Sequence, residues 1–129
     1  MIYTGCILKN NSIGKRISVM SRHTLNDGIT PHPSINCDSY DEWIKILAPS
    51  GKLVGGYYRK EIDWDLFSAK YLDELMEREK RLAVEKLAIR ALSEDFTLLC
   101  IEESPEKCHR RLLAEECKKY LPQIKIQHR

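Results

Sequence analysis

The sequence predicts an α/β fold, a single three-layer α/β/α domain with a small, mainly parallel sheet. Phe96–Ile101 is a continuous apolar run, typical of a strand buried on both faces. A helical pattern follows it, and then a last short strand at Ile124–Gln127. The order strand, helix, strand favours parallel pairing through a right-handed crossover. We expect one domain over residues 1–129, because this length suits a single hydrophobic core.

The first half of the chain predicts two strands, a long loop and a short helix. Ile2–Leu8 and Arg16–Met20 contain β-branched residues and flank a turn, so both are expected to be strands. Ser21–Ser39 is rich in Gly, Pro, Asn and Asp and is expected to be a loop of the length that often carries function. Asp41–Leu47 is predicted to be a short helix, and Gly55–Gly56 a link.

The second half is predicted to be mostly helical up to the buried strand. Asp63 is a suitable N-cap for a helix whose apolar face repeats at spacings of three and four, with Trp64, Phe67, Tyr71 and Leu75. The pattern continues to Leu92, with a bend expected near Glu79. After the strand, Ser104 as N-cap and Pro105 in the first helical position predict the start of the last helix.

Composition and charge exclude several classes of protein. The net charge is only +2, which gives no support to general nucleic-acid coating. No apolar run is long enough to span a membrane, and MIYTGCILKN lacks the features of a signal peptide, so we expect a cytoplasmic protein without a membrane partner. The five cysteines have no CxxC spacing and are expected to be reduced thiols. We therefore expect no metal, and no motif predicts a cofactor.

The residues best suited to catalysis or ligand binding lie at the junction between the buried strand and the last helix. Cys108, His109 and Arg110 lie near the predicted start of that helix, where unpaired N–H groups and the helix dipole favour anions and thiolates. Cys108 is the candidate nucleophile and His109 its candidate catalytic partner. Neighbours on a helix do not face each other, however, so Cys108 can equally be a packing residue and His109 a hydrogen-bonded core histidine.

Candidate ligand-binding residues surround the same junction. Arg22 follows the second predicted strand, at the edge where parallel sheets bind ligands. Arg22 and Arg110 together can form a clamp for a phosphate or carboxylate. Glu102 follows the buried strand directly and can orient His109, act as a general base, or simply belong to a polar turn.

Four segments in this order resemble the domain-of-unknown-function family 488 (DUF 488), in particular its YeaO-like branch. They are GKRISVMSRHTLNDG (Gly14–Gly28), Trp43–Ser50, WDLFSAKYLDEL (Trp64–Leu75) and TLLCIEESPEKCHRRLL (Thr97–Leu113). The resemblance implies a small three-layer α/β fold and points to Arg22 and His109 as the family's polar positions. It implies no activity. Ser21 stands where that branch has an acidic residue, and Cys108 and Arg110 depart from its pattern.

Three functions remain open at this level. The first is binding of an anionic, phosphate- or nucleotide-like small molecule at the strand–helix edge, whether or not a reaction follows. The second is a nucleic-acid or protein interaction module without catalysis, in which Trp43, Tyr57, Tyr58 and Arg59 supply stacking and a basic contact. The third is a thiol-dependent enzyme that uses Cys108. The tyrosine pair Tyr57–Tyr58 is also a candidate contact for a homodimer.

Overall fold

A five-stranded sheet, all parallel, forms the centre of the molecule. The computed structural model describes residues 1–129. The strand order is β3-β2-β4-β1-β5, with β1 at Ile2–Cys6, β2 at Lys15–Ser18, β3 at Glu42–Trp43, β4 at Phe96–Cys100 and β5 at Ile126–His128. The apolar run that predicted a strand buried on both faces is the central strand, β4, and all five of its residues are buried. The predicted α/β class with a parallel sheet is therefore confirmed.

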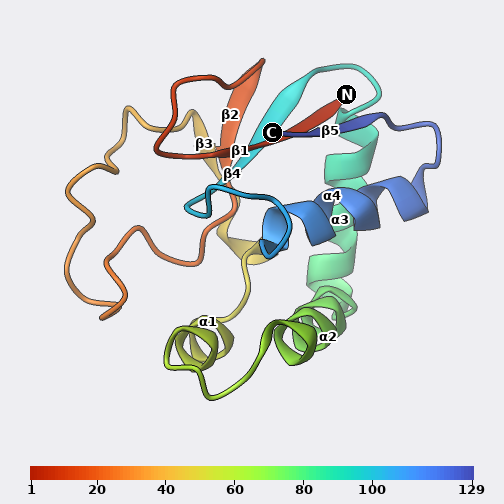
Figure 1. Cartoon of the computed structure of the whole chain (residues 1–129). Coiled ribbons are helices and arrows are strands. Elements are labelled where there is room, and N and C mark those ends of the chain that lie inside the picture. Colours follow the sequence, from red (N-terminus) through yellow and green to blue (C-terminus); the bar gives the residue numbers. More distant parts are fainter.

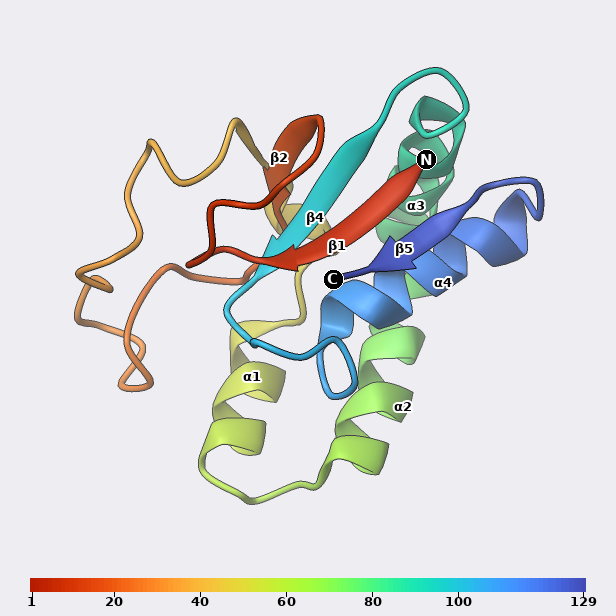
Figure 2. The ribbon, with the colours of Figure 1, turned by 45° about the horizontal axis from the view of Figure 1, so that its top comes forward.

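Four helices gather on one side of the sheet (Figures 1 and 2). They are α1 at Gly51–Tyr58, α2 at Trp64–Leu75, α3 at Arg78–Arg90 and α4 at His109–Tyr120, preceded by a single 3₁₀ turn, η1, at Lys45–Leu47. α4 packs on β1, β4 and β5, and α3 packs on α4. No helix in the structure combines the length and the apolar character needed to cross a membrane.

Alternating residues of the strands form the main core. Ile2 pairs with Phe96 and Ile17 with Leu98 in the parallel ladders, so all four belong to one cluster of 19 buried residues that includes apolar residues of all four helices. The opposite side of β4 is partly covered by the connection between β1 and β2. There the Thr97 hydroxyl donates to the Ile13 carbonyl at 2.7 Å and accepts from the Ile13 N–H at 2.9 Å.

The predicted cap of α2 is confirmed, since the Asp63 carboxylate accepts from the Leu66 N–H at 2.9 Å. The single long helix with a bend near Glu79 is instead two helices. α2 ends at Leu75, and α3 begins at Arg78 after the N-cap Glu77. The apolar face of α2 and that of α3 then contact the core from different directions, which one continuous helix would not allow.

Three local predictions were wrong, and strand pairing explains the first of them. The segment Asp41–Leu47 contains β3 and η1 rather than a helix, because Glu42 and Trp43 pair with β2. Gly55–Gly56 lies inside α1, where both glycines are buried. The last helix begins at His109, with Cys108 as N-cap, rather than at Ser104. Ser104 caps only a local turn through the Glu106 N–H at 3.2 Å.

Candidate functional site

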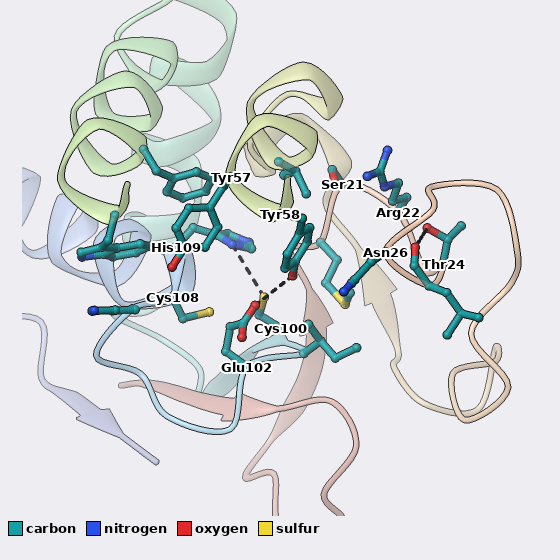
Figure 3. A pocket seen from close by; sticks show the side chains of 17 residues that line it. Ser21, Arg22, Thr24, Asn26, Tyr57, Tyr58, Cys100, Glu102, Cys108 and His109 are labelled. Carbon is teal, nitrogen blue, oxygen red and sulfur yellow. Dashed lines mark hydrogen bonds between the residues drawn. The ribbon is translucent and has the colours of Figure 1, made fainter. Parts of the chain in front are cut away.

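A pocket opens at the carboxyl ends of β2 and β4 (Figure 3). Its walls come from residues 20–26 after β2, from the facing sides of α1 and α2, and from the segment between β4 and α4. The cavity volume is about 50 Å³, which is room for a few waters or a small ionic group. Parallel α/β sheets bind ligands at this edge, because loops from neighbouring strands meet there.

One wall of the pocket is aromatic. Tyr57 and Tyr58 come from the last turn of α1, and Trp64 and Phe67 from the start of α2. The rings support one another: Trp64 stacks on Phe67 at 5.4 Å between centroids, and Tyr57 lies 5.0 Å from Phe67. Because these residues lie in helices rather than loops, their side chains form a supported apolar surface that faces the end of β4.

Three charged side chains line the pocket: Arg22, Lys107 and Glu102. Arg22 is half-buried and Lys107 exposed, and neither makes a hydrogen bond or an ion pair within the chain. Glu102 accepts a hydrogen bond from the Tyr58 hydroxyl at 2.9 Å. Burial, followed by the nearby Glu102 carboxylate, raises the pKa of Tyr58 well above its ordinary value, so this hydroxyl remains a donor. The pocket therefore has two cations without a hydrogen-bonded partner, of which Arg22 lies near the Asp27 carboxylate, and one partnered carboxylate.

His109 is held in one orientation at the floor of the pocket. Its Nε2 lies 2.8 Å from the Val19 carbonyl, which can only accept, so Nε2 carries the proton. The other ring nitrogen, Nδ1, lies 3.7 Å from the Cys100 Sγ (Figure 3). The ring also packs edge-on against Tyr71, with centroids 5.5 Å apart. The histidine thus faces Cys100, and Glu102 does not orient it.

The thiols of Cys100 and Cys108 lie side by side beneath the pocket. A hydrogen bond from Cys108 lowers the pKa of the Cys100 thiol. Burial raises the pKa of Cys108 well above its ordinary value, and the shared bond with Cys100 adds to this. Cys108 is only 1% exposed. Its expected activation at a helix start is therefore not found, because desolvation outweighs the neighbouring positive charges, and its catalytic role stays a prediction.

Arg110 lies in the core rather than in the pocket. It is 0% exposed, although it is a permanent cation. Its guanidinium donates to the Glu102 carbonyl at 2.6 Å and to the carbonyls of Glu103 and Arg129 at 3.4 Å each. It also contacts the Cys108 Sγ at 3.6 Å. The predicted Arg22–Arg110 clamp is therefore not formed, because α4 begins later than expected and turns Arg110 toward the backbone carbonyls.

Several lining residues were missed by sequence reasoning. Cys100 was not among the candidates drawn from the sequence, Tyr58 was considered only as a surface contact, and Trp64 only as part of the apolar face of a helix. The position of Cys100 at the last residue of a buried strand was the available signal, since it stands at the ligand-binding edge of the sheet. The aromatic residues of the wall gave no such signal, because Gly55 and Gly56 led to the prediction of a link where α1 forms.

A family model described as "DUF488-N3a: Active DUF488-N3 subclade" matches residues 7–121. The match covers the site and every strand of the sheet except β1, which precedes it, and β5, which follows it. The chain therefore belongs to the DUF488 family, in agreement with the resemblance drawn from its motifs. No curated protein matches, and no solved structure matches.

Proposed function

We propose that this protein binds a small anionic ligand, phosphate- or nucleotide-like, in the pocket at the carboxyl ends of β2 and β4. One observation carries the proposal: Arg22 and Lys107 line the pocket and neither is held in a hydrogen-bonded ion pair, although the Arg22 charge contributes to lowering the pKa of Asp27. A cation that has no ion pair within the protein is available to a ligand, and guanidinium binds phosphate and carboxylate oxygens in a bidentate way.

The shape of the pocket supports a ligand with an anionic head and an apolar body. The cavity of about 50 Å³ admits a phosphate or carboxylate group but not a whole nucleotide. A larger ligand would extend along the mouth formed by residues 21–26, where Arg22 lies. Tyr58 and Trp64 would then offer aromatic faces to its planar part.

The test is a titration of the isotope-labelled chain, followed by NMR, first with inorganic phosphate and then with a nucleoside monophosphate and its uncharged nucleoside. We expect shifts confined to the pocket. Arg22→Gln should weaken phosphate binding roughly 10-fold, because a hydrogen bond to a charged group contributes about 1.5 kcal/mol or more. Binding of the uncharged nucleoside should change little.

Arg78→Gln is the matched control. Arg78 is exposed at the start of α3, makes no hydrogen bond or ion pair, and does not line the pocket. It removes the same charge from the molecule, so an equal loss of binding in both variants would indicate a general charge effect and refute the site. An absence of pocket shifts with phosphate and nucleotide alike would also refute the proposal.

Two other interpretations have less support. A nucleic-acid or protein interaction module predicts a flat basic surface around Tyr57 and Tyr58, whereas both side chains line a concave pocket. A thiol-dependent enzyme that uses Cys108 predicts an accessible thiol, whereas Cys108 is buried. The homodimer contact and the cytoplasmic location stay predictions.

A further inference from the structure

Three potential metal ligands meet beneath the pocket, although the cysteine spacing predicted no metal. The Sγ atoms of Cys100 and Cys108 and one ring nitrogen of His109 all lie within 4.8 Å of one another. Cys100 ends β4, and Cys108 and His109 begin α4, so the strand–helix junction assembles the set. We propose that these three residues bind a zinc-class divalent metal ion, with a fourth coordination position open to the pocket.

The distances suit a tetrahedral site. With metal–sulfur bonds near 2.3 Å and metal–nitrogen bonds near 2.0–2.1 Å, neighbouring ligand atoms lie about 3.5–3.8 Å apart. Nδ1 of His109 and Sγ of Cys100 already lie 3.7 Å apart. Since the longest separation in the set is within 4.8 Å, closure around an ion needs movements of about 1 Å or less. A rotation of the Cys108 side chain supplies movements of this size.

His109 is oriented as metal-binding histidines are. Its Nε2 donates to the Val19 carbonyl at 2.8 Å, so in the neutral imidazole Nδ1 carries the lone pair, and it faces the Cys100 sulfur. Metal-ligating histidines usually donate their second ring N–H to a carbonyl or carboxylate, because that bond fixes the tautomer and the ring plane. The histidine is therefore positioned for coordination before any ion arrives.

The charge around the two thiols fits thiolate ligands. Arg110 is a fully buried cation, and its Nη1 lies 3.6 Å from the Cys108 Sγ. Two thiolates balance the charge of a divalent ion, and the guanidinium beside Cys108 favours the thiolate form of that ligand. Each thiol that becomes a ligand releases its proton to solvent. Soft thiolate with imidazole is a donor set that favours zinc over magnesium or calcium.

The fourth position distinguishes this site from a closed structural one. Cys100, Cys108 and His109 all line the pocket, so one side of the set faces open space rather than protein. Three protein ligands and an open position are the arrangement of catalytic zinc sites. That the open position receives an anion rests on the proposed function, whereas metal binding itself does not.

The test uses the reduced full-length chain under anaerobic conditions, loaded with Zn²⁺ or Co²⁺ and then dialysed. We expect one ion per chain by native mass spectrometry, and for cobalt a thiolate charge-transfer band in the near ultraviolet. Cys100→Ser and Cys108→Ser should each lower zinc affinity by more than roughly 100-fold, since loss of an outer-shell partner alone costs about 10–100-fold.

Matched controls come from the remaining cysteines. Cys117→Ser removes a buried thiol that lies away from the cluster, and Cys37→Ser an exposed one. Both should retain the ion. If the cluster variants do not fold, the cobalt spectrum of the folded chains decides: a thiolate charge-transfer band that persists in both Cys37→Ser and Cys117→Ser supports the proposal, and its absence from the wild-type chain overturns it.

The proposal is overturned if the wild-type chain does not retain the ion. It is also overturned if Cys100→Ser retains the ion as well as the wild-type chain does, or if Cys37→Ser loses it. Added phosphate gives a separate answer. If phosphate changes the cobalt spectrum, the anion binds at the open position. If the metal binds but phosphate causes no change in the spectrum or in the NMR titration, the anion-binding proposal is wrong and the metal proposal stands.

Discussion

Arg110→Ala tests whether the buried guanidinium holds the strand–helix junction together. Arg110 is the largest fully buried side chain of the protein, and its Nη atoms connect the segment after β4 with the carbonyl of Arg129, at the end of the chain after β5. The 2.6 Å bond to Glu102 is worth about 1.5–3 kcal/mol, because its donor is charged. Two bonds of 3.4 Å and the lost stem add about 1–3 kcal/mol.

The desolvation of the Arg110 guanidinium opposes this stabilisation. A buried cation costs free energy to desolvate, and Arg110→Ala recovers part of that free energy. Its Nε also lacks any hydrogen-bond partner. We therefore expect a net loss of about 2–4 kcal/mol in the free energy of unfolding. This is a large share of the 5–15 kcal/mol typical of a domain.

The assay is urea unfolding followed by far-ultraviolet circular dichroism. Arg110→Met fills much of the same volume without the charge, so it should recover the cavity contribution, about 1 kcal/mol, but not the hydrogen bonds. Arg78→Ala, at an exposed position, should change the free energy of unfolding by no more than about 0.5 kcal/mol. If Arg110→Ala and Arg78→Ala prove equally stable, the guanidinium does not hold the junction and the reasoning fails.

Three further predictions concern the loops and the edge of the sheet. Gly28 has φ of +75°, and a Cβ there would meet the Arg22 guanidinium, so Gly28→Ala should cost about 1–2 kcal/mol and also weaken phosphate binding in the NMR titration. Gly14 has φ of +68°, and a Cβ there would lie against a backbone carbonyl. Gly14→Ala should therefore lower the free energy of unfolding, measured with urea, by about 3 kcal/mol. A loss smaller than that of Gly28→Ala would contradict this prediction. Burial, then the charge of Lys45, lowers the pKa of His23, which packs 4.0 Å from Trp43. His23 is therefore protonated at a higher pH in the unfolded chain than in the folded chain, so the free energy of unfolding should fall as the pH drops below about 6.5. In His23→Asn the free energy of unfolding should fall less steeply over the same pH range.

The sequence by itself determined the elements whose signals are local. The run at Phe96–Ile101, in which Thr97 is the only polar residue, predicted β4, because such a short run is typical of a strand buried on both faces. Asp63 predicted the start of α2, because a cap depends on a side chain and an N–H three residues away. The sequence also indicated the family, because each family motif is a continuous segment of the chain, and the matching family model covers residues 7–121.

The tertiary structure decided which side chains meet. Sequence neighbours suggested that His109 serves Cys108, but the Val19 carbonyl turns its Nδ1 toward Cys100 instead. Similarly, Ser104 and Pro105 have the local pattern of a helix start, yet the segment up to Cys108 stays irregular and supplies carbonyls to Arg110. Orientation, burial and the partners of a buried charge depend on contacts between distant segments, and no pattern along the chain encodes them directly.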